Sequence, residues 1–269
     1  MPITILAHQA PVLPLKRWRP GLDGVALVVG SAVPDLARAT LHSTPRYLFG
    51  RPLWWDGHTV SMQFAWSLPV GLVLTWLVRR LLAPQLAPYL PDLGGFHLRD
   101  LRHVARTRHR WYVIAGSVLI GSFSHILLDS LTHTDRYGGG LLAGLDGTVG
   151  RVLGHEVTVF RIVQLLASLA LSAVTVWELW RIGRERLVCR WSGVPPEPAA
   201  APPFRTAVRV AAVVLLVAAA AGATTQSERG WDIVFVTWLW LGTGAMTLLA
   251  LVLRPASARH PAAEPGPAM

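Results

Sequence analysis

Residues 121–135 read GSFSHILLDSLTHTD and close an otherwise apolar segment of the chain. This stretch carries His125, Asp129 and His133 at intervals of four residues. Because a helix advances about 100° per residue, these three side chains share one face of a helix. Titratable side chains inside an apolar helix are costly, and they mark functional or tightly paired positions. The stripe therefore predicts either a metal site or a self-contained polar cluster.

The spacing of the stripe limits how its side chains can share an ion. Side chains four residues apart on a helix are about 6 Å apart at Cβ, so Asp129 can share an ion with either His125 or His133. The two histidines are about 12 Å apart along the axis, too far to bind the same ion. The pattern predicts two adjacent metal ions bridged by Asp129, or one ion with a supporting residue behind its ligands. In the alternative, Asp129 only pairs with a neighbouring histidine inside a helix bundle.

The composition of the whole chain places this helix in a membrane. Of 269 residues, 52% are hydrophobic and 15% are charged, and the mean hydropathy is +0.42. These values are typical of an all-α, polytopic integral membrane helix bundle. The net charge of +10 comes from basic residues between apolar blocks, which indicates contact with membrane lipids and argues against nucleic-acid binding. The single cysteine, Cys189, excludes a thiolate cluster, so any metal needs His and carboxylate ligands.

Six apolar runs are long enough to cross a bilayer core of about 30 Å. They cover residues 22–41, 58–79, 111–131, 158–180, 206–225 and 232–253. An apolar stretch at 3–15 is too short to cross, and we expect it to form an N-terminal half-helix. The chain then divides into a membrane bundle with the metal site (1–180), a cytoplasmic Pro/Ala-rich linker (181–205), two further transmembrane helices (206–254) and a disordered tail (255–269).

The distribution of arginines predicts how the chain crosses the membrane. Segments 79–110 and 181–205 hold seven and five arginines, whereas 42–57 and 132–157 hold two each and 226–231 holds one. By the positive-inside rule, the two arginine-rich segments and the C-terminal tail are cytoplasmic. This pattern predicts a multi-pass protein of the cell (plasma) membrane, with His133 at the outer face.

Two connecting segments hold clustered polar residues. Residues 97–110, HLRDLRHVARTRHR, predict either a short helix resting on anionic headgroups or a solvated basic loop. The glycine-rich loop 132–157 contains Asp146, His155 and Glu156, and we expect it to be a flexible lid or a simple connector. It is not a phosphate-binding loop, because no strand precedes it and no Lys-Ser/Thr pair follows.

Three other stretches bring titratable side chains toward the depth of the stripe. Asp35 follows Pro34 in the outer half of the first run, where proline frees a carbonyl and kinks a membrane helix. His58 begins the second run at its outer end. His8 lies about as many residues before the turn that precedes the first run as Asp35 lies after it, so their depths nearly match. Alternatively, Asp35 pairs with Arg38 and His8 stays at a free cytoplasmic terminus. Together these groups suit zinc, manganese or iron.

Four short motifs carry a family resemblance. They are MPITILAHQAPVLPL at the start, GSAVPDL at 30–36, GHT at 57–59 and SHILLDSLTH at 124–133. In this order and spacing they resemble the bacterial family called domain of unknown function 4184 (DUF4184). More distantly, they are similar to small inner-membrane proteins named membrane-bound metal-dependent hydrolases. The resemblance covers roughly residues 1–140.

The resemblance implies a bacterial multi-helix membrane protein with a site for a divalent metal, zinc foremost. Carried over to this sequence, the site comprises His8, Asp35, His58, His125, Asp129 and His133. We assign the metal-ligand role to His8, Asp35, His125 and Asp129, and the catalytic role, as a further ligand or proton carrier, to His58 and His133. The more distant group carries an additional acidic residue or histidine after its Pro-Asp pair, where this chain has Ala37 and Arg38.

Three functions remain open from the sequence. The first is a metal-dependent hydrolase that acts on a lipid or lipid-linked ester near the outer membrane face. The second is an ion- or proton-coupled transporter, although the titratable residues are confined to the N-terminal half and we see no internal repeat. The third is a non-catalytic scaffold in which the His/Asp groups only fix helix packing. Nothing in the sequence indicates an oligomeric state.

Overall fold

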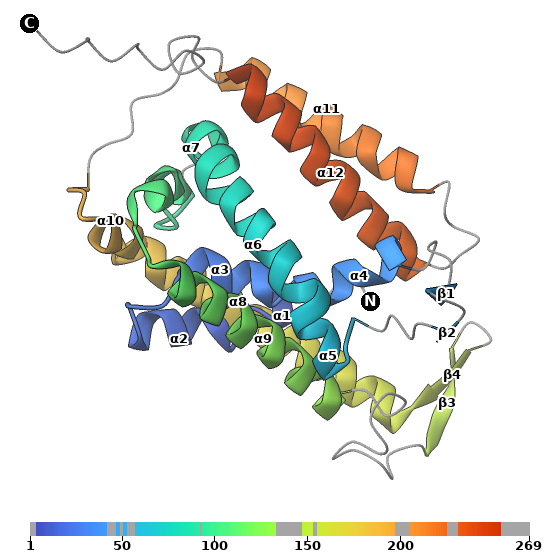
Figure 1. Ribbon diagram of the computed structural model, residues 1–269. Coiled ribbons are helices and arrows are strands. Elements are labelled where there is room, and N and C mark those ends of the chain that lie inside the picture. Colours follow the sequence, from blue (N-terminus) through green and yellow to red (C-terminus); the bar gives the residue numbers. More distant parts are fainter. Residues whose placement is uncertain are drawn as a thin grey trace, which may run out of the picture.

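The computed structural model describes residues 4–41, 47–48, 51–52, 57–91, 93–132, 147–152, 155–196, 205–224 and 231–253. Most of these residues are helical, and Figure 1 shows the helices gathered into a bundle. The strands of this part of the chain form two short antiparallel hairpins, β1 (Tyr47–Leu48) with β2 (Arg51–Pro52) and β3 (Thr148–Val152) with β4 (His155–Thr158). The predicted all-α helix bundle is therefore confirmed.

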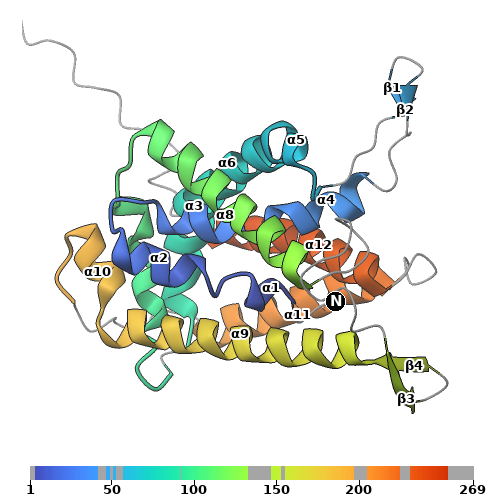
Figure 2. The same cartoon turned by 90° about the horizontal axis from the view of Figure 1, so that it is seen from below.

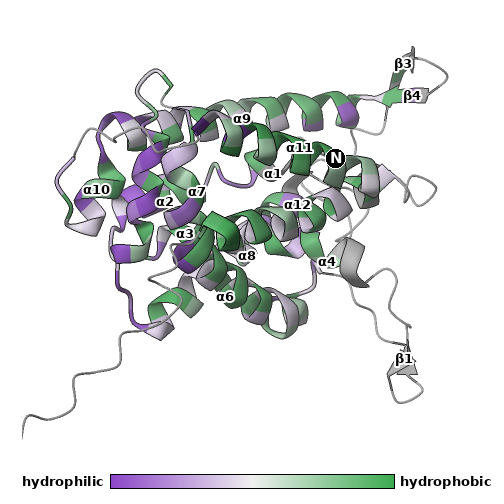
Figure 3. Ribbon diagram, turned by 90° about the horizontal axis from the view of Figure 1, so that it is seen from above, coloured by the Kyte–Doolittle hydropathy of each residue, from purple (hydrophilic) through white to green (hydrophobic). Residues whose placement is uncertain are grey.

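Five helices within the described ranges are long and apolar enough to cross a membrane. They are Val60–Tyr89, Trp111–Ser130, Val159–Arg184, Arg205–Thr224 and Val234–Leu253, and they match the second to sixth apolar runs. Figure 3 shows hydrophobic residues along most of their length. Large apolar side chains on their outer surfaces, such as Leu166 and Val217, are 60% and 62% exposed. Such surfaces suit contact with lipid rather than with water.

The first predicted run, 22–41, is not one spanning helix. It is divided into α3 (Gly24–Gly30) and α4 (Val33–Leu41), with a turn at Ser31 and Ala32. Pro34 explains the break, because proline has no N–H for the carbonyl of Gly30 and its ring collides with that carbonyl. The described chain thus has five candidate spans where the sequence predicted six.

The N-terminal segment, predicted as one half-helix, also consists of two short helices. They are α1 (Thr4–Ala7) and α2 (Val12–Trp18), joined by a turn at residues 8–11. Figure 2 shows both beside the long helix α9 (Val159–Arg184). The Oγ1 of Thr175 on α9 donates a hydrogen bond of 2.7 Å to the carbonyl of Leu6. This contact helps to hold the N-terminal segment inside the bundle.

The second span contains two π-helical turns. Its parts are α5 (Val60–Met62), η1 (Gln63–Ser67), α6 (Leu68–Leu77), η2 (Val78–Leu82), α7 (Ala83–Leu86) and the 3₁₀ turn η3 (Ala87–Tyr89). Pro69 and Pro84 are each the second residue after a π turn. The residues four positions before them lie within those turns, so the wider turn relieves the clash between the proline ring and the carbonyl.

Helix α3 packs directly on α8 (Trp111–Thr132) through glycines. A Cβ atom on Gly30 would lie 2.3 Å from the carbonyl oxygen of Val118, and one on Gly121 would lie 2.3 Å from that of Leu27. Only glycine allows two helix backbones to approach this closely, as in other membrane helix pairs. The contact brings the break after α3 against the C-terminal half of α8, which carries His125 and Asp129.

The C-terminal helices cover the bundle on another side. Helices α11 (Arg205–Thr224) and α12 (Trp231–Leu253) pack against each other, and α12 lies beside α4 (Figure 1). The indole Nε1 of Trp240 donates to the carbonyl of Leu36 over 3.4 Å. The bundle thereby supports α4, which carries Asp35, from outside.

The two arginine-rich segments contain helical structure. The 3₁₀ helix η4 (Leu98–Arg106) lies within residues 97–110, and the predicted linker 181–205 begins with the end of α9 and with α10 (Leu187–Ser192). Arg186 between these helices donates to both carboxylate oxygens of Asp100, at 2.6 and 2.8 Å. Residues 97–110 are therefore packed against α10 in part, rather than being a free loop. The division of the chain into four parts stays a prediction.

Candidate metal centre

Four side chains from three separate segments meet at one point. Asp35 comes from α4, His58 from the turn before α5, and His125 and Asp129 from α8. One ligand atom of each lies within 4.8 Å of the ligand atoms of the other three. The side chains of both histidines and of Asp129 are buried, whereas that of Asp35 is 23% exposed. We call these four residues the His/Asp cluster.

Five of the six separations between ligand atoms of the cluster are close to those of a tetrahedral metal site. The Nε2 of His58 lies 3.1 Å from Asp129 Oδ2 and 3.5 Å from Asp35 Oδ1. The Nε2 of His125 lies 3.5 and 3.6 Å from the same two oxygens, and 3.3 Å from the Nε2 of His58. Zinc bonds to nitrogen and oxygen are about 2.0–2.1 Å long, which places neighbouring ligands of a tetrahedron about 3.3 Å apart. An ion of this size fits between the four groups.

The orientation of the His125 ring is fixed from behind. Its Nδ1 lies 2.7 Å from the carbonyl oxygen of Ser31. Since a carbonyl can only accept, Nδ1 carries a proton and donates to it, and Nε2 points into the cluster. Histidine ligands of metals use this arrangement, in which the second ring nitrogen donates to a carbonyl or carboxylate. The carbonyl of Ser31 lies at the break between α3 and α4.

The buried groups of the cluster need a metal ion or added protons between them. If His125 is neutral, with its proton on Nδ1, its Nε2 and the facing oxygens of Asp35 and Asp129 are all acceptors. Two ionised carboxylates in a buried site also require a compensating charge. One divalent ion satisfies both conditions and makes the site neutral. Protonated imidazoles are the other solution, and they correspond to a purely structural cluster.

The turn that carries His58 fits tightly against α4. A Cβ atom on Gly57 would lie 2.5 Å from the carbonyl oxygen of Pro34 and 2.7 Å from the Cβ of Ala37. Only glycine therefore allows this turn to approach α4. The Nε2 of Gln63 donates to the carbonyls of Gly57 and Thr59, both at 2.8 Å. These contacts fix His58 in position beside Asp35.

His8 lies against the cluster from the N-terminal segment. Its ring stacks on that of His125, with centroids 3.8 Å apart and an interplanar angle of 21°. Its Nε2 lies 3.4 Å from Asp129 Oδ1, the oxygen that the two cluster histidines do not share. Its Nδ1 is buried and has no hydrogen-bond partner among the described residues. The neighbouring Gln9 accepts a 2.9 Å hydrogen bond from Ser31 Oγ, which joins this turn to the break after α3.

The structure brings five of the six predicted site residues together. Asp35, His125 and Asp129 belong to the cluster with His58, and His8 lies beside them. The sequence assigned His8 to the ligands and His58 to catalysis, whereas the geometry places His58 among the four converging groups. The sixth residue, His133, lies outside the described residues. The roles of all six stay predictions.

Other predicted candidates do not take part or fall outside the described chain. Glu156 on β4 is exposed. The side chains of Arg38 and His155 are not described, and Asp146 lies outside the described residues, so the alternative pair between Asp35 and Arg38 stays open.

Sequence reasoning missed the residues that hold the cluster in place. Gln9, Ser31 and Gln63 are polar residues within apolar stretches, and each makes a buried hydrogen bond near the site. A polar side chain in an apolar run is the signal that could have identified them. Gly57 could not be found in this way, because its role depends on the packing of α4.

A second set of buried charges lies at the other end of α3. The carboxylate of Asp23 caps this helix by accepting from the N–H groups of Val25 and Ala26, each at 3.1 Å, and it forms an ion pair with Arg79. Lys16 donates to two backbone carbonyls, both at 2.6 Å, and its ammonium lies 4.7 Å from the ring centre of Trp191. We call Asp23, Arg79 and Lys16 the arginine centre.

The comparison with protein families finds one match. The model of the family described as domain of unknown function (DUF4184) matches residues 1–256. No protein of curated function and no solved structure matches the chain. The match extends well beyond residues 1–140, over which the motifs suggested a resemblance, and includes both C-terminal helices.

Proposed function

The chain belongs to the DUF4184 family, and we propose that it is a membrane-bound, metal-dependent hydrolase of a lipid or lipid-linked ester. We place it in the plasma membrane of a bacterial cell, with its site near the outer face. One observation carries the proposal: five separations of 3.1–3.6 Å join two histidine nitrogens and two carboxylate oxygens around a common centre. These donors suit zinc, manganese or iron.

The burial of the four groups suggests which of them bind the ion and which one transfers protons. His58, His125 and Asp129 are buried and would hold the ion, while Asp35 is 23% exposed at the edge of the cluster and lies 3.5 and 3.6 Å from the two histidine nitrogens. A divalent ion bound by these residues would lower the pKa of a bound water to about 7 and polarise the ester oxygen. Asp35 then accepts a proton from the attacking water and returns it to the leaving alkoxide. His8 orients Asp129 from behind.

The position of the cluster supports a lipid substrate. Asp129 lies eighteen residues after Trp111 on α8, which corresponds to about 27 Å along the helix, close to the thickness of the hydrocarbon core. The cluster therefore lies near one membrane interface if Trp111 lies at the other. Val60 and Phe64, which follow His58, are 61% and 52% exposed and offer an apolar surface beside it. The arginine distribution makes this interface the outer one.

The decisive experiment measures metal content and ester hydrolysis on the same preparations. Wild type, His125→Ala/Asp129→Ala and the control Ser124→Ala are purified in detergent, and their metals are quantified by mass spectrometry. The hydroxyl of Ser124 only bonds within its own helix, to the carbonyl of Gly121 at 2.7 Å, so the control changes a neighbour of the cluster without touching it. We expect about one ion per chain and release of fatty acid or phosphate from lipid substrates in wild type and control only.

One observation favours a second function, that of a structural metal site in a non-catalytic scaffold. If Asp35 is a fourth ligand, the tetrahedron is closed, and closed four-ligand sites are structural. Asp35→Asn separates the two functions. Retained metal with lost hydrolysis supports Asp35 as the proton acceptor, whereas lost metal and a lowered melting temperature, with no hydrolysis in wild type, support the scaffold.

A further inference from the structure

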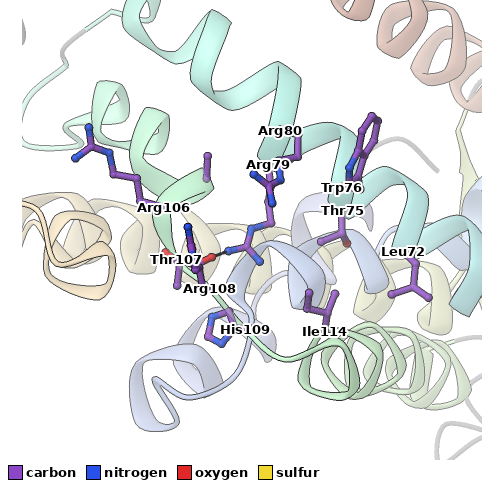
Figure 4. A pocket seen from close by; sticks show the side chains of 11 residues that line it. Leu72, Thr75, Trp76, Arg79, Arg80, Arg106, Thr107, Arg108, His109 and Ile114 are labelled. Atoms are coloured by element: carbon purple, nitrogen blue, oxygen red, sulfur yellow. Dashed lines mark hydrogen bonds between the residues drawn. The ribbon is translucent and has the colours of Figure 1, made fainter. Parts of the chain in front are cut away.

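A large pocket opens at the opposite end of α6 and α8 from the His/Asp cluster. Its volume is about 810 Å³, and Figure 4 shows its wall formed by α6, η2, the start of α8 and the segment between η4 and α8. Leu72, Trp76 and Ile114 form an apolar side. Three exposed arginines, Arg80, Arg106 and Arg108, line the rest together with Arg79, Thr107 and His109.

The pocket carries positive charge that the described residues do not neutralise. Arg80, Arg106 and Arg108 form no ion pair or hydrogen bond with any described residue, and no carboxylate lines the pocket. Arg79 differs, because it is bound to Asp23 and to the carbonyls of Val104 and Thr107. Three guanidinium groups are therefore free to bind an anion, and arginine binds phosphate oxygens through paired hydrogen bonds.

The depth of the pocket agrees with a lipid headgroup. Arg80 follows Val60 by twenty residues in the second span, about 30 Å along a helix, which is the thickness of the hydrocarbon core. Trp76 and Trp111 nearby are 62% and 79% exposed. Exposed tryptophans mark the interface between hydrocarbon and headgroups. The arginines thus lie where phosphates lie, and the apolar side faces the acyl chains.

A buried hydroxyl group in the same pocket also lacks a partner. Thr75 is 2% exposed, and its Oγ1 makes no hydrogen bond with the described chain. It lines the pocket one turn before Arg79 (Figure 4). Buried hydroxyls are normally paired, so an unsatisfied one in a pocket indicates a ligand atom that it contacts. A glycerol or phosphate oxygen supplies such an atom.

We propose that this pocket binds the phosphate of an anionic phospholipid, with the headgroup on Arg80, Arg106 and Arg108 and an acyl chain along Leu72, Trp76 and Ile114. Basic pockets between membrane helices on the cytoplasmic side bind lipids of this kind. The same chemistry fits a free phosphate ion, which lacks the acyl chain. The site is independent of the His/Asp cluster and of any hydrolase activity.

The test compares the binding of three probes to the full-length protein in neutral detergent. Native mass spectrometry counts bound phosphatidylglycerol, phosphatidylcholine and inorganic phosphate on wild type, Arg106→Gln/Arg108→Gln and Arg19→Gln/Arg190→Gln. The last variant is the control: it removes the same charge from two exposed arginines that lie outside this pocket and whose side chains form no hydrogen bond or ion pair with the described residues. If the first double variant fails to fold, Arg80→Gln is used in its place to remove positive charge from the pocket.

We expect wild type and control to prefer phosphatidylglycerol over phosphatidylcholine, and the pocket variants to bind it about 10- to 30-fold more weakly. Competition by inorganic phosphate, lost in the same variants, would support the anion site and identify free phosphate as a ligand. Its failure to compete would support the lipid. Equal binding of phosphatidylglycerol to wild type and to every folded pocket variant would overturn the proposal. So would an equal loss in the control, which would mean non-specific surface charge.

Discussion

The two ends of helix α3 each hold buried charge, but they pair it in opposite ways. At the first end, the arginine centre matches donors with acceptors: Asp23 accepts from two backbone N–H groups and from Arg79, whose other nitrogens donate to carbonyls. At the second end, the His/Asp cluster places the Nε2 atoms of His58 and His125 3.1–3.6 Å from carboxylate oxygens. The first arrangement contains its own cation, and the second needs either a bound metal ion or protonated imidazoles.

This difference separates structural from functional charge in one bundle. Both centres contain carboxylates that are costly to bury, so burial alone does not distinguish them. The nature of the facing atoms does. A guanidinium supplies fixed donors and makes a centre self-sufficient, whereas imidazoles and carboxylates that face each other form a site that a metal ion or added protons can complete. The comparison predicts that ligand removal affects only one end of α3, and that charge removal destabilises mainly the other.

The largest effect is expected for Asp129→Asn. This carboxylate contacts both cluster histidines and His8, so its loss should abolish stoichiometric metal binding and lower hydrolysis about a thousandfold or more. Metal analysis and initial rates with a lipid ester measure both. Ser130→Ala, one residue along α8, changes a hydroxyl that bonds to Leu127 in its own helix and should leave both unchanged. A variant that kept one ion per chain would remove Asp129 from the ligand set.

The next effect concerns stability rather than metal. Arg79→Gln leaves Asp23 buried without its cationic partner, and we expect the free energy of unfolding to fall by about 3 kcal/mol. The adjacent Arg80→Gln is the matched control, because Arg80 is exposed and bound to no described residue, and it should change stability by less than about 0.5 kcal/mol. Denaturant titration in lipid-free detergent measures both. Equal losses from the two variants would contradict the distinction between the two ends of α3.

A smaller effect should follow from adding one methyl group. In Gly57→Ala the new Cβ meets the carbonyl of Pro34 at 2.5 Å, so the turn with His58 has to move away from α4. Residues that position metal ligands typically contribute a factor of about 10–100 in affinity, and we expect a loss of this size with the protein still folded. Competition with a metal-binding dye measures the affinity. Unchanged affinity would mean that His58 is not a ligand.

The sequence identified the cluster where its members are linked by helix geometry. His125 and Asp129 follow from a spacing of four residues in an apolar run, and the depth of His8 follows from counting residues on both sides of a turn. Pro34 also signalled the disruption near Asp35, although the kink is a complete break. Each of these inferences concerns one or two neighbouring segments of the chain, whose local backbone geometry follows from residue spacing and from proline.

The sequence could not separate Arg79 from Arg80, nor find the partner of Asp23. The two arginines are adjacent in the sequence and were counted together in segment 79–110, yet their side chains leave the helix in different directions, so that one is buried against α3 and the other is exposed. Their difference depends on which helix packs beside them. The same reason explains why Ser31 was missed: its carbonyl faces His125 only because glycines let α3 and α8 touch.

The smallest predicted effect is a pH dependence from the arginine centre. Lys16 is the chain's single lysine, and burial, with a further contribution from Arg79, lowers its pKa from 10.5 to about 8. Below pH 8 the lysine is charged in the folded and unfolded states, and stability does not change through it. Between about pH 8 and 10.5 the unfolded state holds the extra proton, so stability rises with pH, by about 1 kcal/mol from pH 8 to pH 9. Lys16→Met should lack this rise, and the difference between the two unfolding free energies at both pH values cancels the other titrating groups. Parallel curves would mean that Lys16 keeps its ordinary pKa, and that this end of α3 is more open to water than its contacts indicate.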